Sequence, residues 1–365
     1  MFKIPTLISL VVALAIAYFS FWPVPITPHV WQPSIDPGFT GYFASNTRLE
    51  EFESLTMGRQ TGPEAAILEA DGSILATSHE GWLVRFQKNE RVSEPWIDVK
   101  GRPLGLDADE QGNIWVANAY LGLQKVTPEG AVSIAVDQVD GSLIGYADDV
   151  AVSKNGKIYF SDATTRFRAK KWGGTLPASI LDIVEHGKTG RIVEYDPVSN
   201  TSRIVLKGLN FANGVASDPN GQFILVNETG EYRVWKLWVD GPKKGDREVI
   251  LDGLPGFPDN ISAGREGVFW VGVMSPRSKD IDKYAAKPFW RKVIIRLPEF
   301  MKPKPQDYGM VIGISSDGEV LQNLQAPSGR LYATTGLVET DDYLYVTSLT
   351  APFLAKVKKS DAGLK

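Results

Sequence analysis

Residues 150–163 read VAVSKNGKIYFSDA. It holds a short apolar run, an Asn-Gly turn and a second apolar run, which is the pattern of a tight β-hairpin. The pattern recurs at residues 65–78 (AAILEADGSILATS), 105–119 (GLDADEQGNIWVANA), 215–228 (VASDPNGQFILVNE), 261–273 (ISAGREGVFWVGV) and, in a degenerate form, 336–349 (GLVETDDYLYVTSL). The turn positions are Gly72, Gly112, Gly156, Gly221, Gly267 and Asp342.

Six hairpins at this spacing predict an all-β chain that forms a six-bladed β-propeller over residues 47–359. Each hairpin is followed by further apolar runs, so a unit has about 50 residues, the size of a four-stranded blade. A β-sandwich is the competing fold, but it does not need six similar units. Residues 47–57 read as a strand before the first hairpin. We expect this strand to be the outer strand of the last blade, where it closes the ring and protects an edge.

The N-terminal segment stands apart from the propeller. Residues 4–22 carry no charge and are mostly apolar, and 19 helical residues would span roughly 28 Å, close to the thickness of a bilayer core. We therefore expect a transmembrane signal-anchor helix over residues 1–24, with a cleaved signal peptide as the alternative. Because Lys3 precedes the apolar run, the propeller should lie on the non-cytoplasmic side. A proline-rich stalk is expected over residues 25–46 and a short tail over residues 360–365.

The composition excludes several classes of site. The chain of 365 residues has no cysteine, which rules out disulfides, thiolate zinc sites and cysteine nucleophiles. With only His29, His79 and His186, there is little material for a multi-histidine metal site or a serine–histidine triad. The formal net charge is −4 and no long basic run occurs, so nucleic acid is not expected as a partner.

A column of oxygen-bearing side chains appears when positions are counted back from the turns. The residues eight positions before the five turn glycines are Glu64, Leu104, Asp148, Asn213 and Asp259. An equal offset from the same turn means the same height and face on the equivalent strand of each blade. If that strand is the innermost one, these side chains converge at one end of the central channel. Asp149 and Asn260 follow directly after two of them.

Four of these five side chains carry oxygen donors, which favours a hard cation. Calcium accepts six to eight oxygen ligands in flexible geometry, so it suits a wide ring of side chains better than magnesium does. We predict a calcium site formed by Glu64, Asp148, Asn213, Asp259 and Asn260. The alternative is structural, because Asp and Asn are common in turns and caps.

At these residues the chain resembles the calcium propellers that include gluconolactonases, paraoxonases and strictosidine synthase-like proteins. The resemblance rests on the motifs Gly62-Pro63-Glu64, Ala147-Asp148-Asp149, Asn213-Gly214 and Phe257-Pro258-Asp259-Asn260. The runs RPLGL, YADDVAV, GRIVEYDP, FANGVA and LPGFPDNIS bring it nearest to the branch of strictosidine synthase-like and adipocyte plasma-membrane-associated proteins. The resemblance implies a calcium ion on the four motif residues and an N-terminal membrane anchor, and it places the insertion at residues 163–188 above the channel as a lid.

The chain also departs from this superfamily at positions that carry chemistry. The histidine pair that supports hydrolysis in paraoxonases corresponds to Leu104 and Ala119. The glutamate that promotes condensation in strictosidine synthase corresponds to Thr335, and Glu339 lies four residues further on. His79 is interpreted as an ordinary surface histidine, and His186 falls in the lid.

These observations leave three functional hypotheses. The first is a calcium-dependent hydrolase of small apolar or aromatic esters or lactones, in which Asp259 or Asp148 activates water or attacks directly. The second is a non-catalytic propeller that binds a ligand or partner at the same mouth, which the missing histidine pair favours. The third is a synthase that forms carbon–nitrogen bonds, which Thr335 disfavours.

Overall fold

The computed structural model describes residues 4–364, with side chains described from residue 8 onward. Apart from one two-stranded hairpin, the strands form six four-stranded antiparallel sheets, which confirms the six-bladed propeller. Each hairpin turns where the sequence predicts it, and the turn glycines adopt the left-handed backbone that their positions require, such as φ +79° at Gly156. Residues 1–3 of the expected anchor, including Lys3, and residue 365 of the expected tail lie outside the described residues.

The first three blades follow one another along the chain, each with its strands in sequence order from the channel outward. Blade one comprises β2 (Ala66–Leu68), β3 (Ile74–Thr77), β4 (Trp82–Phe86) and β5 (Glu94–Asp98). Blade two comprises β6 (Pro103–Ala108), β7 (Ile114–Asn118), β8 (Gly122–Val126) and β9 (Val132–Val136). Blade three comprises β12 (Ala147–Val152), β13 (Ile158–Asp162), β14 (Gly190–Asp196) and β15 (Thr201–Leu209).

The remaining blades complete the ring. Blade four comprises β16 (Ala212–Ser217), β17 (Phe223–Glu228), β18 (Arg233–Trp238) and β19 (Arg247–Asp252). Blade five comprises β20 (Gly256–Ala263), β21 (Phe269–Pro276), β22 (Gly309–Ile314) and β23 (Val320–Ala326). Blade six comprises β24 (Thr334–Glu339), β25 (Tyr343–Ser348), β26 (Phe353–Lys358) and β1 (Glu53–Thr56). The first strand of every blade contacts the first strands of both neighbouring blades, so these six strands surround the channel.

The ring closes through a strand from the other end of the chain, as expected. β1 pairs antiparallel with β26, with Leu55 opposite Leu354. Both leucines are buried in an apolar cluster that also contains Met57 and Phe86 of blade one. Closure therefore joins the N-terminal part of the propeller to its last blade by both hydrogen bonds and packing.

The second strand of a blade is buried on both faces, since each face packs against a neighbouring blade. β7, β13 and β17 are buried along their whole length, and their sequences are nearly continuous apolar runs. Continuous apolar runs of this length are typical of strands covered on both sides. The apolar core of the protein thus lies between the blades and leaves the channel end free for polar side chains.

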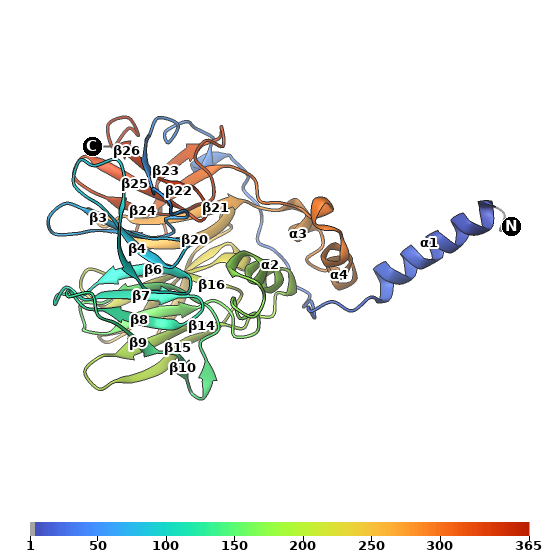
Figure 1. Ribbon diagram of the computed structural model, residues 1–365, viewed down its shortest axis with the longest axis horizontal. Coiled ribbons are helices and arrows are strands. Elements are labelled where there is room, and N and C mark those ends of the chain that lie inside the picture. Colours follow the sequence, from blue (N-terminus) through green and yellow to red (C-terminus); the bar gives the residue numbers. More distant parts are fainter. Residues whose placement is uncertain (1–3, 365) are drawn as a thin grey trace.

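Four α-helices lie in the described residues, namely α1 (Ile4–Phe21), α2 (Thr175–Glu185), α3 (Lys279–Lys283) and α4 (Pro288–Arg296). The short elements are η1 (Gly41–Phe43), η2 (Thr229–Glu231), η3 (Glu299–Met301), β10 (Gln138–Val139) and β11 (Ser142–Leu143). Figure 1 shows α2, α3 and α4 on one side of the propeller and α1 projecting away on that side. Within residues 4–364, no helix combines the length and the apolar character needed to cross a bilayer. The predicted transmembrane helix is therefore not confirmed.

Candidate metal centre

Five of the six channel-lining strands have a β-bulge near the positions of the sequence column, whereas β2 of blade one has none and begins after Glu64. The pairing register shifts between Pro103 and Leu106, Ala147 and Val150, Ala212 and Val215, Pro258 and Ile261, and Thr334 and Leu337. The bulged residues include Leu104, Asp148, Asn213, Asp259 and Thr335. A bulge re-aims a side chain and ends regular pairing. The constant offset from the turn therefore corresponds to a repeated structural feature, and Thr335 takes the sixth place.

Hydrogen bonds across the channel end hold these strands together. The Asn260 side-chain amide donates to the main-chain oxygen of Glu64 at 3.1 Å, and the Thr335 hydroxyl donates to the same oxygen at 2.6 Å. These bonds link blades five and six to blade one. Between blades four and five the backbones approach so closely that a Cβ on Gly214 would lie 2.5 Å from the Ile261 nitrogen. Only glycine fits at this approach.

The five predicted ligands are all buried, with exposed fractions of 2–7 %. Four of their side-chain oxygens have no hydrogen-bond partner among the described residues: Asp148 Oδ2, Asn213 Oδ1, Asp259 Oδ1 and Asn260 Oδ1. An unpaired buried oxygen costs about 1–3 kcal/mol, so four in one region need a physical explanation. A bound cation is such an explanation, because it would accept electron pairs from all of them.

The electrostatics of the carboxyl groups lead to the same interpretation. Burial, and then the neighbouring Glu64, raise the pKa of Asp148 and the pKa of Asp259 well above their ordinary values. Burial raises the pKa of Glu64 to about 7, although the Arg102 guanidinium opposes this rise. Three buried carboxyl groups thus repel one another with one arginine beside them. A divalent cation would remove this repulsion.

The donor chemistry of the candidate site fits calcium. Among residues 4–364, no three His, Asp or Glu side chains are grouped as a metal site. The candidate set includes two amide oxygens besides carboxylates, and it contains only oxygen donors. This composition is what calcium prefers. The fit therefore rests on the donor types and the unpaired oxygens.

Asp149, the neighbour of Asp148, has a structural role instead. Its Oδ1 accepts from the Val150 backbone amide and its Oδ2 accepts from the Val215 backbone amide, both at 2.9 Å. Asp149 therefore links blade three to blade four next to the candidate metal site.

The structure adds three residues to this region that the sequence column does not contain. Arg102 is buried and places its guanidinium 3.2 Å from Glu64 Oε2. Tyr146 is buried, and its pKa is raised by burial and then by Asp148. Asn227 donates from its side chain to the Asp259 main-chain oxygen at 2.6 Å, and its own Oδ1 is unpaired. Asn227 lies six residues after Gly221, so counting forward from the turn would have found it.

An apolar cluster, called the roof from here on, lies on one side of the candidate metal site. Leu104 and Ala119, which replace the paraoxonase histidines, pack in one cluster with Tyr146 and Phe211. The cluster also includes Ala178 of α2, Val184 of α2 and Ile26 of the stalk. The lid predicted at residues 163–188 therefore packs over the Leu104 position, and the surroundings there are apolar.

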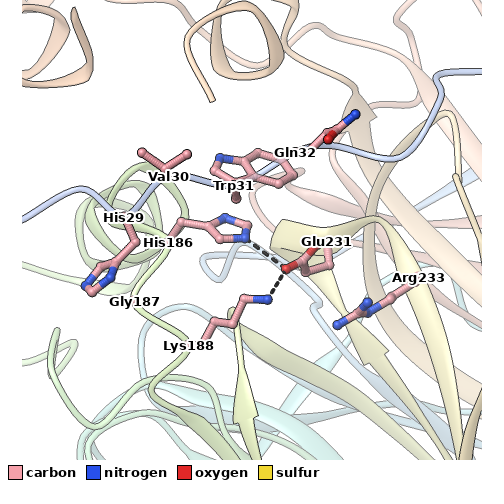
Figure 2. Close-up of a pocket in the computed structure, with 9 residues that line it drawn as sticks. All are labelled: His29, Val30, Trp31, Gln32, His186, Gly187, Lys188, Glu231 and Arg233. Atoms are coloured by element: carbon pink, nitrogen blue, oxygen red, sulfur yellow. Dashed lines mark hydrogen bonds and ion pairs between the residues drawn. The ribbon is translucent and has the colours of Figure 1, made fainter. Parts of the chain in front are cut away.

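His186 lies in the lid, but it has structural partners. The residue is 2 % exposed, and its ring stacks on Trp31 at 4.0 Å and contacts Glu231 Oε1 through Nε2 at 2.9 Å. Figure 2 shows Glu231 between His186 and Lys188, whose Nζ is 2.6 Å from the same oxygen. The surrounding pocket of about 400 Å³ is lined by none of the predicted ligands. We interpret this pocket as a space between the stalk and the lid, at the point where the stalk crosses the lid.

Two other candidates from the sequence do not belong to the candidate metal site. His79 is exposed, in line with its interpretation as a surface histidine. Glu339 pairs with Lys359 at 2.8 Å and accepts from the Trp270 indole at 2.8 Å. Its carboxylate thus links blade six to Trp270 of blade five and does not replace the glutamate missing at Thr335.

Comparisons with known proteins place this architecture in a family. A family model described as strictosidine synthase matches residues 148–242, and one described as strictosidine synthase-like, N-terminal, matches residues 41–86. Strictosidine synthase-like protein 13 of Arabidopsis thaliana is 34 % identical over 77 % of this chain and 72 % of its own length. The chain belongs to the strictosidine synthase-like family. The adipocyte plasma membrane-associated protein of Bos taurus is a further relative, 30 % identical over 92 % of this chain and 85 % of its own length.

Solved structures similar to this family member are propellers as well. A gluconolactonase from Xanthomonas campestris superimposes with a TM-score of 0.62 at 17 % identity and covers 92 % of this chain and 98 % of its own. A calcium-binding protein, regucalcin, from Agrobacterium tumefaciens superimposes with a TM-score of 0.56 at 13 % identity, covering 84 % and 93 %. At these identities the likeness establishes the fold alone.

Proposed function

We propose that this strictosidine synthase-like protein is a calcium-dependent hydrolase of small apolar or aromatic esters or lactones. The observation that carries the proposal is the group of unpaired, buried oxygens on Asp148, Asn213, Asp259 and Asn260 beside Glu64. A purely structural role would leave the free-energy cost of these unpaired oxygens uncompensated. The group lies at the channel end beneath the apolar roof. The proposed ligands are Glu64, Asp148, Asn213, Asp259 and Asn260. The structural neighbours named as a gluconolactonase and a calcium-binding protein are consistent with a calcium-dependent hydrolase.

The residues of the chain have separate roles in this proposal. Calcium at the ring would polarise the substrate carbonyl and stabilise the developing oxyanion. Asp259 or Asp148 would accept a proton from the attacking water or attack the carbonyl itself. Arg102 holds Glu64 in place, and the roof around Leu104 would exclude bulk water and contact the apolar part of the substrate.

A non-catalytic binding propeller is the alternative, and a specific observation favours it. Leu104 and Ala119 are buried in the apolar cluster and offer no proton-transfer group where paraoxonases have histidines. A carbon–nitrogen bond-forming synthase is disfavoured, because Thr335 is buried and its hydroxyl donates to Glu64.

The decisive experiment is a substrate screen of the full chain in detergent against aryl esters and lactones. Each substrate is assayed with calcium, with magnesium and after exhaustive chelation. We expect turnover of at least one substrate that chelation abolishes and calcium restores. Binding of such compounds without turnover in calcium would favour the binding propeller.

We also propose that α1 attaches the propeller to a membrane, as a single-pass anchor with the propeller on the non-cytoplasmic side. Among the residues whose side chains are described, apolar ones along α1 are exposed, for example Leu14 and Ile16, each 61 % exposed, and the end of the helix contacts α4. The name of the bovine relative, which describes a plasma membrane-associated protein, is consistent with attachment. Carbonate extraction and protease protection of the expressed chain would test anchor and orientation, and release by carbonate would contradict the anchor.

A further inference from the structure

Blade five carries an insertion, residues 277–308 between β21 and β22, that exposes large apolar side chains. It contains α3, α4 and η3. Phe289 and Trp290 at the start of α4 are each 49 % exposed, and Phe300 and Met301 in η3 are 82 % and 55 % exposed. Four large apolar side chains left in solvent within one insertion indicate an interaction surface.

The insertion is also strongly cationic within an acidic chain. Residues 277–308 contain nine Lys or Arg and four Asp or Glu, whereas the whole chain has a formal net charge of −4. Lys283, Lys287 and Lys304 are exposed. Exposed lysines around aromatic side chains favour a surface that is apolar beneath an anionic layer, as a bilayer with anionic lipids is.

The arginines of the insertion fix its position on the protein, and Lys302 pairs with Glu299 within the insertion. Arg291 donates to the Val184 main-chain oxygen of the lid at 2.8 Å. Arg296 donates to the Phe19 and Trp22 main-chain oxygens at 2.8 and 2.6 Å, which caps the end of α1. The insertion is therefore attached both to the lid and to the end of the apolar α1 helix.

The surroundings of α4 extend the same surface. Figure 1 shows α2 and α4 on the side of the propeller from which α1 projects. α2 exposes Leu176 and Ile180, which lie one turn apart. At the end of α1, Phe21 and Trp22 are 82 % and 61 % exposed, which suits the aromatic composition of a membrane interface.

We propose that this insertion is a second membrane contact, in which Phe289, Trp290, Phe300 and Met301 enter the interfacial layer of a bilayer and the lysines bind anionic headgroups. The contact holds the lid side of the propeller against the membrane, and it stands whether α1 crosses the bilayer or lies on it. It is independent of the hydrolase activity.

The absence of cysteine from the sequence makes a direct test straightforward. The full chain with Met301→Cys carries one environment-sensitive fluorophore, and the control carries it at Val198→Cys, which is 93 % exposed in the turn between β14 and β15. Both proteins are reconstituted in phosphatidylcholine vesicles with and without phosphatidylserine, using lipids that bear a quencher. We expect strong quenching at position 301, enhanced by phosphatidylserine, and little at position 198.

A charge variant separates the contribution of the insertion to membrane contact from that of α1. Lys283, Lys287 and Lys304 are changed to Glu in the Met301→Cys chain, and the matched control changes the exposed Lys88, Lys154 and Lys207 to Glu. The first set should lose at least half of the quenching at position 301, and the second set should retain it. Equal quenching at positions 301 and 198, or none at 301 while the protein is vesicle-bound, would overturn the proposal. So would a fluorophore at 301 that is already shielded without vesicles, since another protein surface would then cover it.

Discussion

Asp259 combines the two properties that the hydrolase proposal requires of a residue. Its Oδ1 is buried and unpaired, and its neighbours include the Glu64 carboxyl group. Asp259→Asn keeps the size but removes one ligand charge and the proton acceptor. We expect at least a hundredfold loss in kcat/KM on any substrate found, roughly 2.7 kcal/mol of transition-state stabilisation. His79→Ala, at an exposed position, is the control and should retain activity. Full activity in Asp259→Asn would remove this residue from the mechanism.

Arg102 is predicted to matter most when calcium is removed. Its guanidinium is buried beside Glu64, and removing one partner of a buried pair costs about 3 kcal/mol. Arg102→Met should lower the free energy of unfolding by this amount in chelator and by less in calcium, since the metal would neutralise Glu64. Denaturant unfolding in both conditions measures the difference.

The control for Arg102 is an ion pair elsewhere in blade one. Arg85 and Glu69 are 2.6 Å apart, and their side chains are 22 % and 20 % exposed. Arg85→Met should therefore cost about 1 kcal/mol or less, with no dependence on calcium. An Arg102→Met deficit that is the same with and without calcium would argue against a metal at Glu64.

At the scale of the element, β1 is predicted to contribute stability to the whole ring. Leu55 is 3 % exposed and pairs with Leu354 in the closing sheet. Leu55→Ala should destabilise the protein by about 3 kcal/mol through lost burial and a cavity. Its neighbour Ser54 is exposed, and Ser54→Ala should change stability little. Urea unfolding monitored by tryptophan fluorescence compares the two variants, and equal midpoints would show that closure contributes little.

The hairpins and the column were predictable because they depend on local periodicity. Turn glycines and alternating apolar residues repeat in five of the six units, so these blades and the offset of eight residues follow from counting. The sixth unit shows the limit of counting. Thr335 precedes Asp342 by seven positions, and only the register shift identifies it as a member of the ring.

Contacts between distant segments could not be predicted in the same way. Arg102 reaches Glu64 from the next blade, and Tyr146 approaches Asp148 from the preceding loop. The packing of Ile26 of the stalk with Leu104 likewise joins segments that no periodicity relates. Such contacts depend on how the blades are arranged around the channel, which a pattern within one blade does not describe.

For the whole molecule, the strongest prediction is that calcium stabilises the folded propeller. A cation that binds only the folded state adds RT ln(1 + [L]/Kd), about 2.7 kcal/mol at a hundredfold excess over Kd. Exhaustive chelation should therefore lower the thermal midpoint, and calcium should restore it. Magnesium should restore less, because it requires a tighter octahedral geometry than side chains from separate blades provide.

Two variants show whether this stabilisation arises at the ring. Asp148→Asn and Asn213→Ala each alter one proposed ligand, so the rise in midpoint with calcium should shrink in both. Asp317→Asn removes a carboxylate whose side chain is 82 % exposed on blade five, and it should leave the calcium effect unchanged. An equal calcium effect in all three variants would place the cation elsewhere on the protein. An unchanged thermal midpoint of the wild-type chain after chelation would instead mean that the unpaired oxygens are tolerated without a metal. The packing of the six inner strands alone would then have to explain the arrangement of these side chains.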